Sequence, residues 1–475
     1  MEYIPTIGLE IHAELKTATK MFCDSKNDAD EKRPNVNVCP VCLAHPGTLP
    51  VINKEAVKHV LRVGIALGSK LADYTEFDRK NYFYPDLPKG YQISQYEYPL
   101  VSGGILNGVA ITRIHLEEDT ASSAHDDGTS ATLIDFNRSG VPLMELVTDP
   151  VITSSAQAGA FARELQLLLR YLGASDANME KGEMRVEANI SVSKTADLGT
   201  KVEVKNLNSF RTMERAVDHE IKRQISVLER GERVIQETRG WDENKQATFA
   251  QRVKEGSADY RYFPDPDLPS LKISEIEYLN RYTLLETISE LPWVRRERYC
   301  KLGVRTEDVE AYVRDTVLGA FFEDVIKGLT PDKIVLASNY ISNDLINLIR
   351  DIEIRDTDSK YEIPISAEYF RKLISMIFEK KISSRGAKDI LQIMIKEQKD
   401  PEEIAHTHGL FQNTSSEDLM LLIDKIILDN QPAVEEYKGG KLTTLEYLVG
   451  QCMKATKGAV DADTARECLR SKLSG

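Results

Sequence analysis

Three stretches of the chain alternate hydrophobic and polar residues with a period of two, which predicts β-strands. They span residues 7–15, 185–192 and 201–206. Because successive side chains of a strand point to opposite faces of a sheet, each strand has one hydrophobic and one polar face. The polar faces carry, in order, Gly8, Glu10, His12 and Glu14; Arg185, Glu187, Asn189 and Ser191; and Lys201, Glu203 and Lys205.

Two longer stretches repeat hydrophobic residues at helical spacing. Residues 155–172 carry one such stripe, and Gly173 is the expected stop. Residues 211–230 carry another, with Ser209 as the expected N-cap and Gly231 as the stop. Strands interrupted by two helices, rather than alternating strictly with them, predict an α+β domain with a mainly antiparallel sheet.

The composition and the hydrophobic pattern of the sequence change near residue 291. Before it the chain is rich in Gly, Pro, Asn and Tyr, and after it the pattern is almost wholly helical, with a soft boundary near residues 400–408. A length of 475 residues also suggests about three domains. We therefore predict an α+β domain at 1–291, an all-α helical domain at 292–405 and a small α-helical tail domain at 406–475.

Composition and charge narrow the class of protein. A chain with 41% hydrophobic and 29% charged residues is typical of a globular protein, and a net charge of −14 argues against a general nucleic-acid coat protein but permits a local basic patch. No apolar run approaches the roughly 18 residues of a membrane span, and residues 1–10 resemble neither a signal nor a transit peptide. Six cysteines are too few for a disulfide scaffold. We expect a cytoplasmic protein with no membrane partner.

The polar strand faces have two explanations. Alternating charge is ordinary on a solvated sheet face, but a His and a Glu two residues apart on one face also suit a divalent metal. Residues 116–119 add three adjacent carboxylates, which repel one another unless a cation or solvent relieves them. Glu145 lies in the apolar run 141–147, where a buried charge needs a partner, either a salt bridge or a metal.

Together these residues are of the types that ATP–magnesium chemistry requires. Magnesium is usually held by one or two carboxylates plus substrate phosphates. The chain has no G-x-x-x-x-G-K-[ST] loop, no kinase-type glycine loop and no G-x-S-x-G elbow or Ser-rich amidase signature. It thus shows no obvious nucleophile for hydrolysing a nitrogen donor.

One segment identifies a family. Residues 78–95, DRKNYFYPDLPKGYQISQ, closely resemble the signature of the B subunit of the tRNA-dependent aspartyl/glutamyl amidotransferase. The similarity extends from residue 4 to the C-terminus. Further matching blocks lie at 7–12, 115–119, 171–185, 203–210, 259–264 and 448–458.

The resemblance implies a fold and a reaction. The first domain would be a glutamine-synthetase-like cradle that uses ATP and Mg²⁺ to phosphorylate the side-chain carboxylate of mischarged Glu-tRNA(Gln) or Asp-tRNA(Asn). Ammonia, released from glutamine by a separate glutaminase (A) subunit, then attacks the acyl phosphate to give Gln-tRNA(Gln) or Asn-tRNA(Asn). A small C subunit completes the heterotrimer. The helical and tail domains would bind the tRNA.

The resemblance also assigns residues by position. Magnesium is assigned to Glu10, His12, Glu118 and Glu145. The nucleotide and acyl-phosphate site is assigned to Arg185, Glu187, Asn189, Glu203, Lys205 and Asn206. Catalytic roles fall to Glu10, His12, Arg185, Glu187 and Lys205, joined by Lys80 and Lys89, which border the ammonia entry in the family. A surface salt bridge is the alternative for both lysines.

The cysteines near the start leave two possibilities open. Cys23, Cys39 and Cys42 are spaced C-x15-C-x2-C, but structural zinc sites have four ligands. Some family members carry a Cys-x-Cys at the first position, where this chain has Ser25. Either Zn²⁺ binds with His45 or Asp24 as the fourth ligand, or the three thiols are reduced and free of metal.

The charge changes sign near the C-terminus. Residues 437–475 hold seven Lys and Arg against four Asp and Glu, a net +3, whereas residues 401–436 hold one against eight, a net −7. Phosphate contacts drive tRNA affinity, and the basic segment lies where the family binds tRNA. The candidate tRNA contacts are Lys441, Lys454, Lys457, Arg466 and Arg470. The alternative is a solvated, mixed-charge helix pair.

Overall fold

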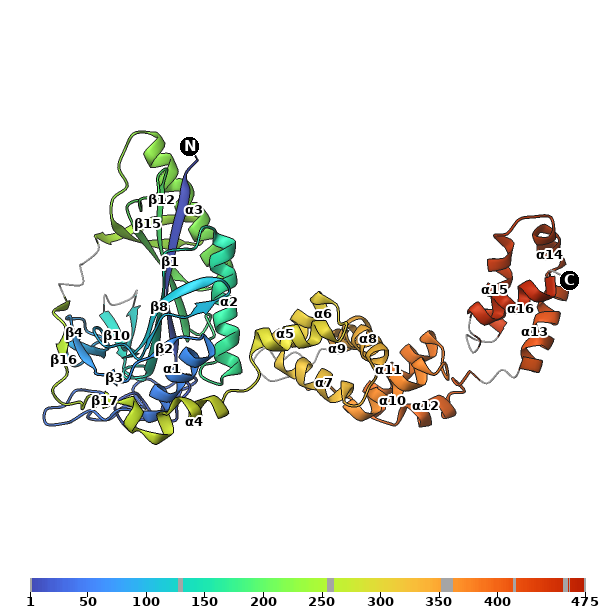
Figure 1. The fold of residues 1–475 in the computed structure, drawn as a ribbon, viewed down its shortest axis with the longest axis horizontal. Coiled ribbons are helices and arrows are strands. Elements are labelled where there is room, and N and C mark those ends of the chain that lie inside the picture. Colours follow the sequence, from blue (N-terminus) through green and yellow to red (C-terminus); the bar gives the residue numbers. More distant parts are fainter. Residues whose placement is uncertain are drawn as a thin grey trace. The chain divides into compact units, whose positions relative to one another are not determined.

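The computed structural model describes residues 2–126, 131–253, 260–351, 362–412, 416–455, 460 and 462–473. The chain forms two compact units, Met1–Pro292 and Trp293–Gly475 (Figure 1). Within the described part, no helix is both long and apolar enough to cross a bilayer. The finer division at residues 405 and 406 stays a prediction.

A mixed sheet, ten-stranded in the described residues, forms the centre of the first unit. Its strand order is β15-β14-β13-β12-β1-β11-β8-β6-β2, and β7 pairs with β8. Pairing of described strands in this sheet is antiparallel except between β13 and β14. The strands are β1 (Ile4–Glu14), β2 (Lys70–Leu71), β6 (Val101–Ser102), β7 (Ile105–Leu106), β8 (Val109–Glu118), β11 (Pro142–Thr148), β12 (Met184–Ser193), β13 (Val202–Leu207), β14 (Glu237–Asp242) and β15 (Ala247–Val253).

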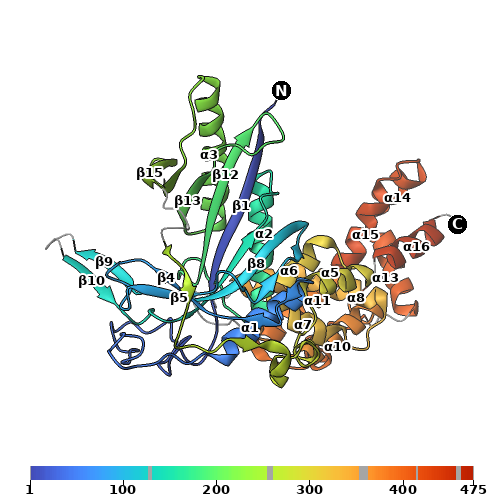
Figure 2. The ribbon, with the colours of Figure 1, turned by 60° about the vertical axis from the view of Figure 1, so that its left-hand side comes forward.

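Smaller sheets flank this one. One joins β4 (Asp78–Asn81), β5 (Tyr91–Ser94) and β16 (Phe263–Pro264). Another pairs β3 (Tyr74–Thr75) with β17 (Leu271–Lys272). A hairpin of β9 (Ser122–Asp126) and β10 (Ala131–Asp135) extends away from helices α2 and α3 (Figure 2).

Helices α1 (Lys54–Ala66), α2 (Ser155–Tyr171) and α3 (Phe210–Glu229) lie beside the sheet (Figure 1). The two predicted helices are confirmed as α2 and α3. The Ser209 side chain accepts a hydrogen bond from the Thr212 N–H, as expected of an N-cap. Gly173 and Gly231 follow the two helices with φ of +62° and +76°, a conformation that glycine adopts without strain.

The hydrophobic core lies between the sheet and these helices. Ile7, Leu9, Ile11 and Ala13 of β1 are at most 1% exposed, as are the α2 residues Phe161 and Leu165. Alternation along β1 sends Glu10 and His12 to the opposite face, as predicted. Helix packing therefore covers the apolar face and leaves the polar face for another role.

The second unit is helical throughout its described elements, which confirms an α+β region followed by a helical one. The elements are α5 (Pro292–Lys301), α6 (Thr306–Arg314), α7 (Thr316–Ile326), α8 (Pro331–Tyr340), the π-helical η4 (Ile341–Leu345), α9 (Ile346–Asp351), α10 (Ala367–Phe378), α11 (Ser384–Glu397), α12 (Pro401–Thr407), α13 (Ser416–Asp429), α14 (Gln431–Lys438), α15 (Thr444–Ala455) and α16 (Ala462–Leu473). Buried residues between Leu419 and Leu473 form one cluster, contributed by α13 to α16 and by Val460 between the last two helices. The last elements that lie wholly within the first unit are the 3-10 turns η2 (Ile273–Glu275) and η3 (Glu277–Leu279) and the short helix α4 (Arg281–Glu286).

Candidate active site

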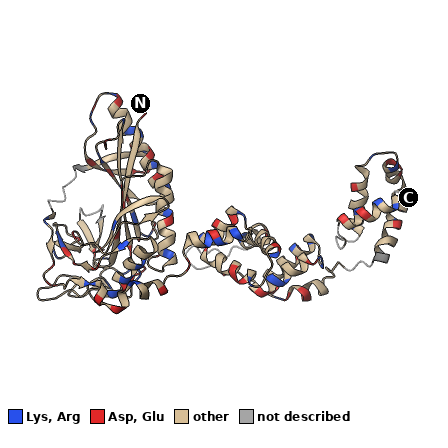
Figure 3. Ribbon diagram, viewed as in Figure 1, with Lys and Arg blue, Asp and Glu red and all other residues tan. Residues whose placement is uncertain are grey.

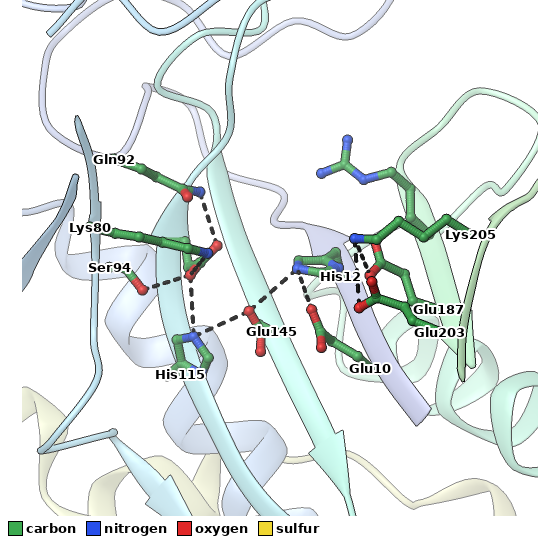
Figure 4. A network of polar contacts seen from close by, with 12 residues as sticks. Glu10, His12, Lys80, Gln92, Ser94, His115, Glu145, Glu187, Glu203 and Lys205 are labelled. Atoms are coloured by element: carbon green, nitrogen blue, oxygen red, sulfur yellow. Dashed lines mark hydrogen bonds and ion pairs between the residues drawn. The ribbon is translucent and has the colours of Figure 1, made fainter. Parts of the chain in front are cut away.

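Four neighbouring strands place polar residues directly opposite one another. Arg185 on β12 faces His12 on β1, His12 faces Glu145 on β11, and Glu145 faces His115 on β8. Opposite residues on adjacent strands share a face of the sheet, so these side chains form one row. Glu187 likewise lies opposite Glu10. Figure 4 shows this convergence from strands far apart in sequence.

The row forms part of the wall of a cavity of about 700 Å³, which we call the strand-face cavity. Among the predicted site residues, its wall contains Glu10, His12, Lys80, Glu145, Arg185, Glu187, Glu203 and Lys205. Its wall also contains residues to which the sequence assigned no site role, among them Gln92, Arg113, His115, Glu117, Asp119, Arg138, Tyr96 and Tyr262.

Glu145 stands at the centre of the row, between two imidazoles. Its Oε2 atom is 3.3 Å from His12 Nε2 and 3.4 Å from His115 Nε2. Glu10 Oε1 is 3.8 Å from the same nitrogen of His12. The side chain of Glu145 is only 7% exposed, so these polar neighbours supply the partners that its buried charge needs.

The crowded charges shift the pKa values of the group. Burial, followed by the nearby charges of Glu145 and Glu187, raises the pKa of Glu10 to about 7. Burial alone would lower the pKa of His12, but the hydrogen bond and charge of Glu145 raise it to about 9. The pKa of Glu145 is held well below its usual value by the two histidines, against the effect of its burial. Such crowding is what a bound cation would relieve.

The donor atoms fit a divalent cation. Within the described residues, ligand atoms lie within 4.8 Å of one another in three overlapping groups on this face: Glu10, His12 and Glu145; His115, Glu117 and Glu145; and Glu10, Glu187 and Glu203. Carboxylate oxygens are the ligands that Mg²⁺ prefers. The first group shares Glu145 with the second and Glu10 with the third, so a cation bound by the first group would lie between the other two.

The β12–β13 side of the cavity carries four of the predicted nucleotide contacts. Lys205 Nζ is 2.7 Å from Glu187 Oε2 and 3.9 Å from Glu203 Oε1. Arg185 donates to Asp119 Oδ2 at 3.0 Å. Asn189 lies opposite Glu203 in the register of β12 and β13, and Asn206 is exposed with φ of +62°. Neither asparagine is among the described residues that line the cavity.

The structure places Glu118 apart from the row. Its carboxylate accepts hydrogen bonds from Lys89 Nζ at 2.7 Å and from the backbone N–H of Ile93 at 2.9 Å. Glu118 and Lys89 line a second, smaller cavity of about 250 Å³. Strand alternation is the reason, since Glu118 points to the face opposite Glu117. The geometry therefore does not bring Glu118 to Glu10, His12 and Glu145.

Glu117 and His115 are functional candidates that the sequence placed in a charged, family-like segment but to which it assigned no role. Glu117 accepts hydrogen bonds from Ser94 Oγ at 2.6 Å and Gln92 Nε2 at 2.9 Å, and lies 3.7 Å from Lys80 Nζ. Against the effect of burial, the charge of Lys80 lowers the pKa of Glu117 to about 2. The signal was present: His115 and Glu117 have the same two-residue spacing as Glu10 and His12.

The two predicted lysines thus lie in different places. Lys80 pairs with Glu117 in the strand-face cavity, and Lys89 pairs with Glu118 in the smaller one. Both form the ion pairs that were the alternative explanation, but these pairs are largely buried rather than at an open surface.

The three cysteines come together near the smaller cavity. The Sγ atoms of Cys23, Cys39 and Cys42 lie within 4.8 Å of one another. Neither Asp24 nor His45 joins this group of described ligand atoms, and Ser25 Oγ lies 3.7 Å from Cys42 Sγ.

A cation already lies beside these thiols. The buried Lys20 has its Nζ 3.8 Å from Cys42 Sγ. The hydrogen bond from Cys23, aided by the charge of Lys20, lowers the pKa of Cys42 to about 4. Three thiols with an ammonium group alongside do not make the four-ligand set of a structural zinc site.

Ion pairs occupy some of the predicted tRNA contacts near the C-terminus, where acidic and basic positions are interspersed along the helices (Figure 3). Lys441 Nζ is 2.8 Å from Glu436 Oε2, and Arg466 pairs with Glu446 at 2.7 Å and with Asp463. Lys454 is exposed. Arg470 lies on α16, and Lys457 lies outside the described residues.

Comparisons with known proteins identify the family of the chain. Residues 5–278 match the model of the GatB/GatE catalytic domain, and residues 320–473 match that of the GatB domain. The chain is 41% identical, over all of its length and 99% of the relative, to the B subunit of an aspartyl/glutamyl-tRNA(Asn/Gln) amidotransferase of Carboxydothermus hydrogenoformans. The B subunit of a chloroplastic/mitochondrial glutamyl-tRNA(Gln) amidotransferase of Physcomitrium patens is 40% identical over the whole chain and 86% of the relative.

Proposed function

Because this chain belongs to the family of B subunits of the tRNA-dependent aspartyl/glutamyl amidotransferases, we propose that its strand-face cavity activates the side-chain carboxylate of a tRNA-bound amino acid. The protein is then one component of a ligase that forms C–N bonds. The single observation that carries this assignment is the row of Arg185, His12, Glu145 and His115 across four strands, within one cavity.

The chemistry explains why such a cavity is useful. A carboxylate is a poor acyl donor, and transfer of the γ-phosphoryl group of ATP to its oxygen creates a leaving group that ammonia displaces as phosphate. This step needs charge neutralisation and alignment rather than a protein nucleophile. Magnesium would be held by Glu10, His12 and Glu145, where it would neutralise the phosphate oxygens.

The residues around that centre have separate tasks. Arg185 and Lys205 carry the positive charge that would bind phosphate oxygens, and Asp119 and Glu187 orient them. Lys80, held by Glu117, lies on the other side of Glu145 in Figure 4, where the reacting carboxylate would be bound. Glu203 belongs to the nucleotide side through its contact with Lys205.

The first unit also supports the proposal of a glutamine-synthetase-like cradle. A largely antiparallel sheet buries one face under helices and presents a concave, charged face to substrates. The rest of the proposal concerns partners: a glutaminase (A) subunit supplies ammonia, a small C subunit completes a heterotrimer, and the helical region binds Glu-tRNA(Gln), Asp-tRNA(Asn) or both. Lys89, which pairs with Glu118 in the smaller cavity, remains a candidate for the border of the ammonia entry.

The test begins with co-purification of the chain with its glutaminase and small partners. The complex is then assayed for ATP- and glutamine-dependent amidation of both mischarged tRNAs. Glu10→Ala and Glu145→Ala should each abolish amide formation while tRNA affinity stays nearly unchanged, because both side chains lie at the cation centre rather than on the tail. Glu229→Ala, at an exposed position at the end of α3, is the matched control and should be fully active.

Two outcomes would contradict the proposal. Turnover with free glutamate but not with Glu-tRNA would indicate a stand-alone ammonia ligase. Unchanged amidation in Glu10→Ala and Glu145→Ala would indicate a tRNA-binding scaffold whose catalytic centre lies in another protein of the complex.

A further inference from the structure

Two tyrosines form a flat surface in the wall of the strand-face cavity. The rings of Tyr96 and Tyr262 are stacked, with centroids 4.3 Å apart and planes inclined by 11°. Both residues line the cavity, and Tyr96 is 51% exposed although one of its ring faces is covered by Tyr262. The exposed half of Tyr96 therefore offers surface on which a planar group can stack.

The backbone on both sides of this pair is fixed. The N–H of Tyr96 donates to Oδ2 of Asp78, a side chain that is buried, at 2.9 Å. Asn81 Nδ2 donates to the carbonyl oxygen of Arg261 at 2.9 Å, and Phe263 then pairs with Arg79 in the small sheet. The backbone that carries the two rings is thus held in place before any ligand binds, which lowers the entropic cost of stacking on them.

The tyrosine pair lies on the Lys80 side of the cavity. Lys80 Nζ is 5.2 Å from the ring centroid of Tyr260, whose edge packs against Tyr262. Lys80 also lies next to Glu117, on the opposite side of Glu145 from Lys205, as Figure 4 shows. The phosphate-binding cations Arg185 and Lys205 belong to β12 and β13 instead. A nucleotide bound by Arg185 and Lys205 would leave the tyrosine pair available to bind the other substrate.

That other substrate ends in an adenine. A mature tRNA carries its amino acid on the ribose of a 3′-terminal adenosine, and only the ester and a short side chain separate this ribose from the reacting carboxylate. A carboxylate placed beside Lys80 therefore brings the terminal adenosine close to the same wall. Bases stack on aromatic side chains, and loss of one such contact typically weakens binding about tenfold or more.

We propose that the stacked pair of Tyr96 and Tyr262 is the platform on which the 3′-terminal adenine of the aminoacyl-tRNA stacks, so that the pair positions the acyl group for phosphorylation. The inference rests on the proposed function of the cavity. Tyr96 and Tyr262 are positioning and binding residues rather than participants in proton transfer. The flat ring, and not the hydroxyl group, supplies the contact.

Steady-state kinetics of the assembled complex provide the first test. Tyr96→Ala should raise KM for Glu-tRNA or Asp-tRNA at least about tenfold and leave KM for ATP within about twofold, whereas Tyr96→Phe should behave as wild type because it keeps the ring. Tyr282→Ala, at a 79% exposed tyrosine on α4, is the control for loss of an exposed aromatic side chain. A selective rise in KM for ATP would assign the platform to the nucleotide and overturn the inference, as would unchanged constants for both substrates.

A binding measurement separates this inference from the proposed function. A tRNA whose terminal adenine is replaced by 2-aminopurine should lose fluorescence on binding, because stacking on tyrosine quenches that base. The quenching should persist in Glu145→Ala, which has an intact platform, and disappear in Tyr96→Ala. Quenching without amidation in the wild-type complex would refute the proposed function alone. Full quenching in Tyr96→Ala would refute the platform alone.

Discussion

Glu117 and Glu118 are neighbours in sequence but point to opposite faces of β8. Glu117 faces Lys80, His115 and the strand-face cavity, and Glu118 faces Lys89 and the smaller cavity. A strand reverses its side chains at each residue, so two adjacent carboxylates do not share one cation. Because the two carboxylates have different surroundings, we expect the loss of each one to affect a different property of the protein.

A comparison of Glu117→Gln with Glu118→Gln tests this difference. Glu117 shares ligand distance with His115 and Glu145, so we expect its loss to raise the Mg²⁺ concentration needed for half-maximal ADP formation by about tenfold or more. Glu118→Gln should leave that requirement within about twofold, because its carboxylate contacts Lys89 and the Ile93 N–H instead. Equal shifts in both variants would show that Glu118 is a metal ligand after all, as the family position predicts.

The pair of Glu14 and Asp119 makes stability depend on pH. Burial, followed by the charge of Asp119, raises the pKa of Glu14 to about 8, although Arg138 and Arg185 oppose the shift. Between the usual pKa of 4.5 and this value, the folded state keeps a proton that the unfolded state releases. The free energy of unfolding of the metal-free protein should therefore fall as pH rises through this window, by up to about 1.4 kcal/mol per pH unit from this group.

Glu14→Gln keeps the shape of the protonated side chain and removes its titration. Between pH 5.5 and 7.5 this variant should lose about 2 kcal/mol less stability than the wild type. Urea unfolding with EDTA present, followed by Trp241 fluorescence in a Trp293→Phe background, measures the first unit. Parallel pH profiles of the two proteins would show that Glu14 is ionised in the folded state.

The sequence predicted the local structure well where the pattern was regular. The alternation in residues 7–15 indicated which side chains of β1 are buried, and Ser209 and Gly231 indicated the ends of α3. It did not predict which strands are neighbours. Strand order depends on contacts between residues more than a hundred positions apart, such as His12 with Glu145, and no local signal encodes them. The family resemblance implied only that residues such as His12 and Glu145 share one site, and it did not give the order of the strands.

The separation of Glu117 from Glu118 has a local cause. Residues 116–119 were treated as one group of charges, although the strand continues to Glu118 and alternation separates its neighbours. The period-two pattern of His115 and Glu117 was visible in the sequence. The surroundings of each carboxylate, however, depend on β5, which is distant in sequence. Gln92 and Ser94 of β5 donate hydrogen bonds to Glu117, and the backbone N–H of Ile93 donates one to Glu118.

The cysteine cluster should become a zinc site after one substitution. Ser25 Oγ is 3.7 Å from Cys42 Sγ, so Ser25→Cys adds a fourth thiol beside Cys23, Cys39 and Cys42. We expect this variant to retain about one equivalent of zinc per chain after dialysis, as four-ligand sites do, and the wild type and Ser25→Ala to retain far less. Metal analysis by mass spectrometry measures the content. Stoichiometric zinc in the wild type would show that another ligand joins the three thiols and that the Lys20 ammonium group moves away from Cys42.

The tail helices should contact tRNA unequally through their basic residues. Arg466 already forms ion pairs with Glu446 and Asp463, so a phosphate that binds Arg466 would have to displace these carboxylates. A phosphate that binds the exposed Lys454, at the end of α15, would not have to displace either of them. Lys454→Ala should therefore weaken tRNA binding and reduce the slope of log Kd against log salt by about 0.7–0.9, and Arg466→Ala should change the slope less. Fluorescence anisotropy of labelled tRNA at several KCl concentrations gives both slopes, with Lys425→Ala on the acidic segment as the control. A larger loss of slope in Arg466→Ala than in Lys454→Ala would mean that the ion pairs of Arg466 open when tRNA binds.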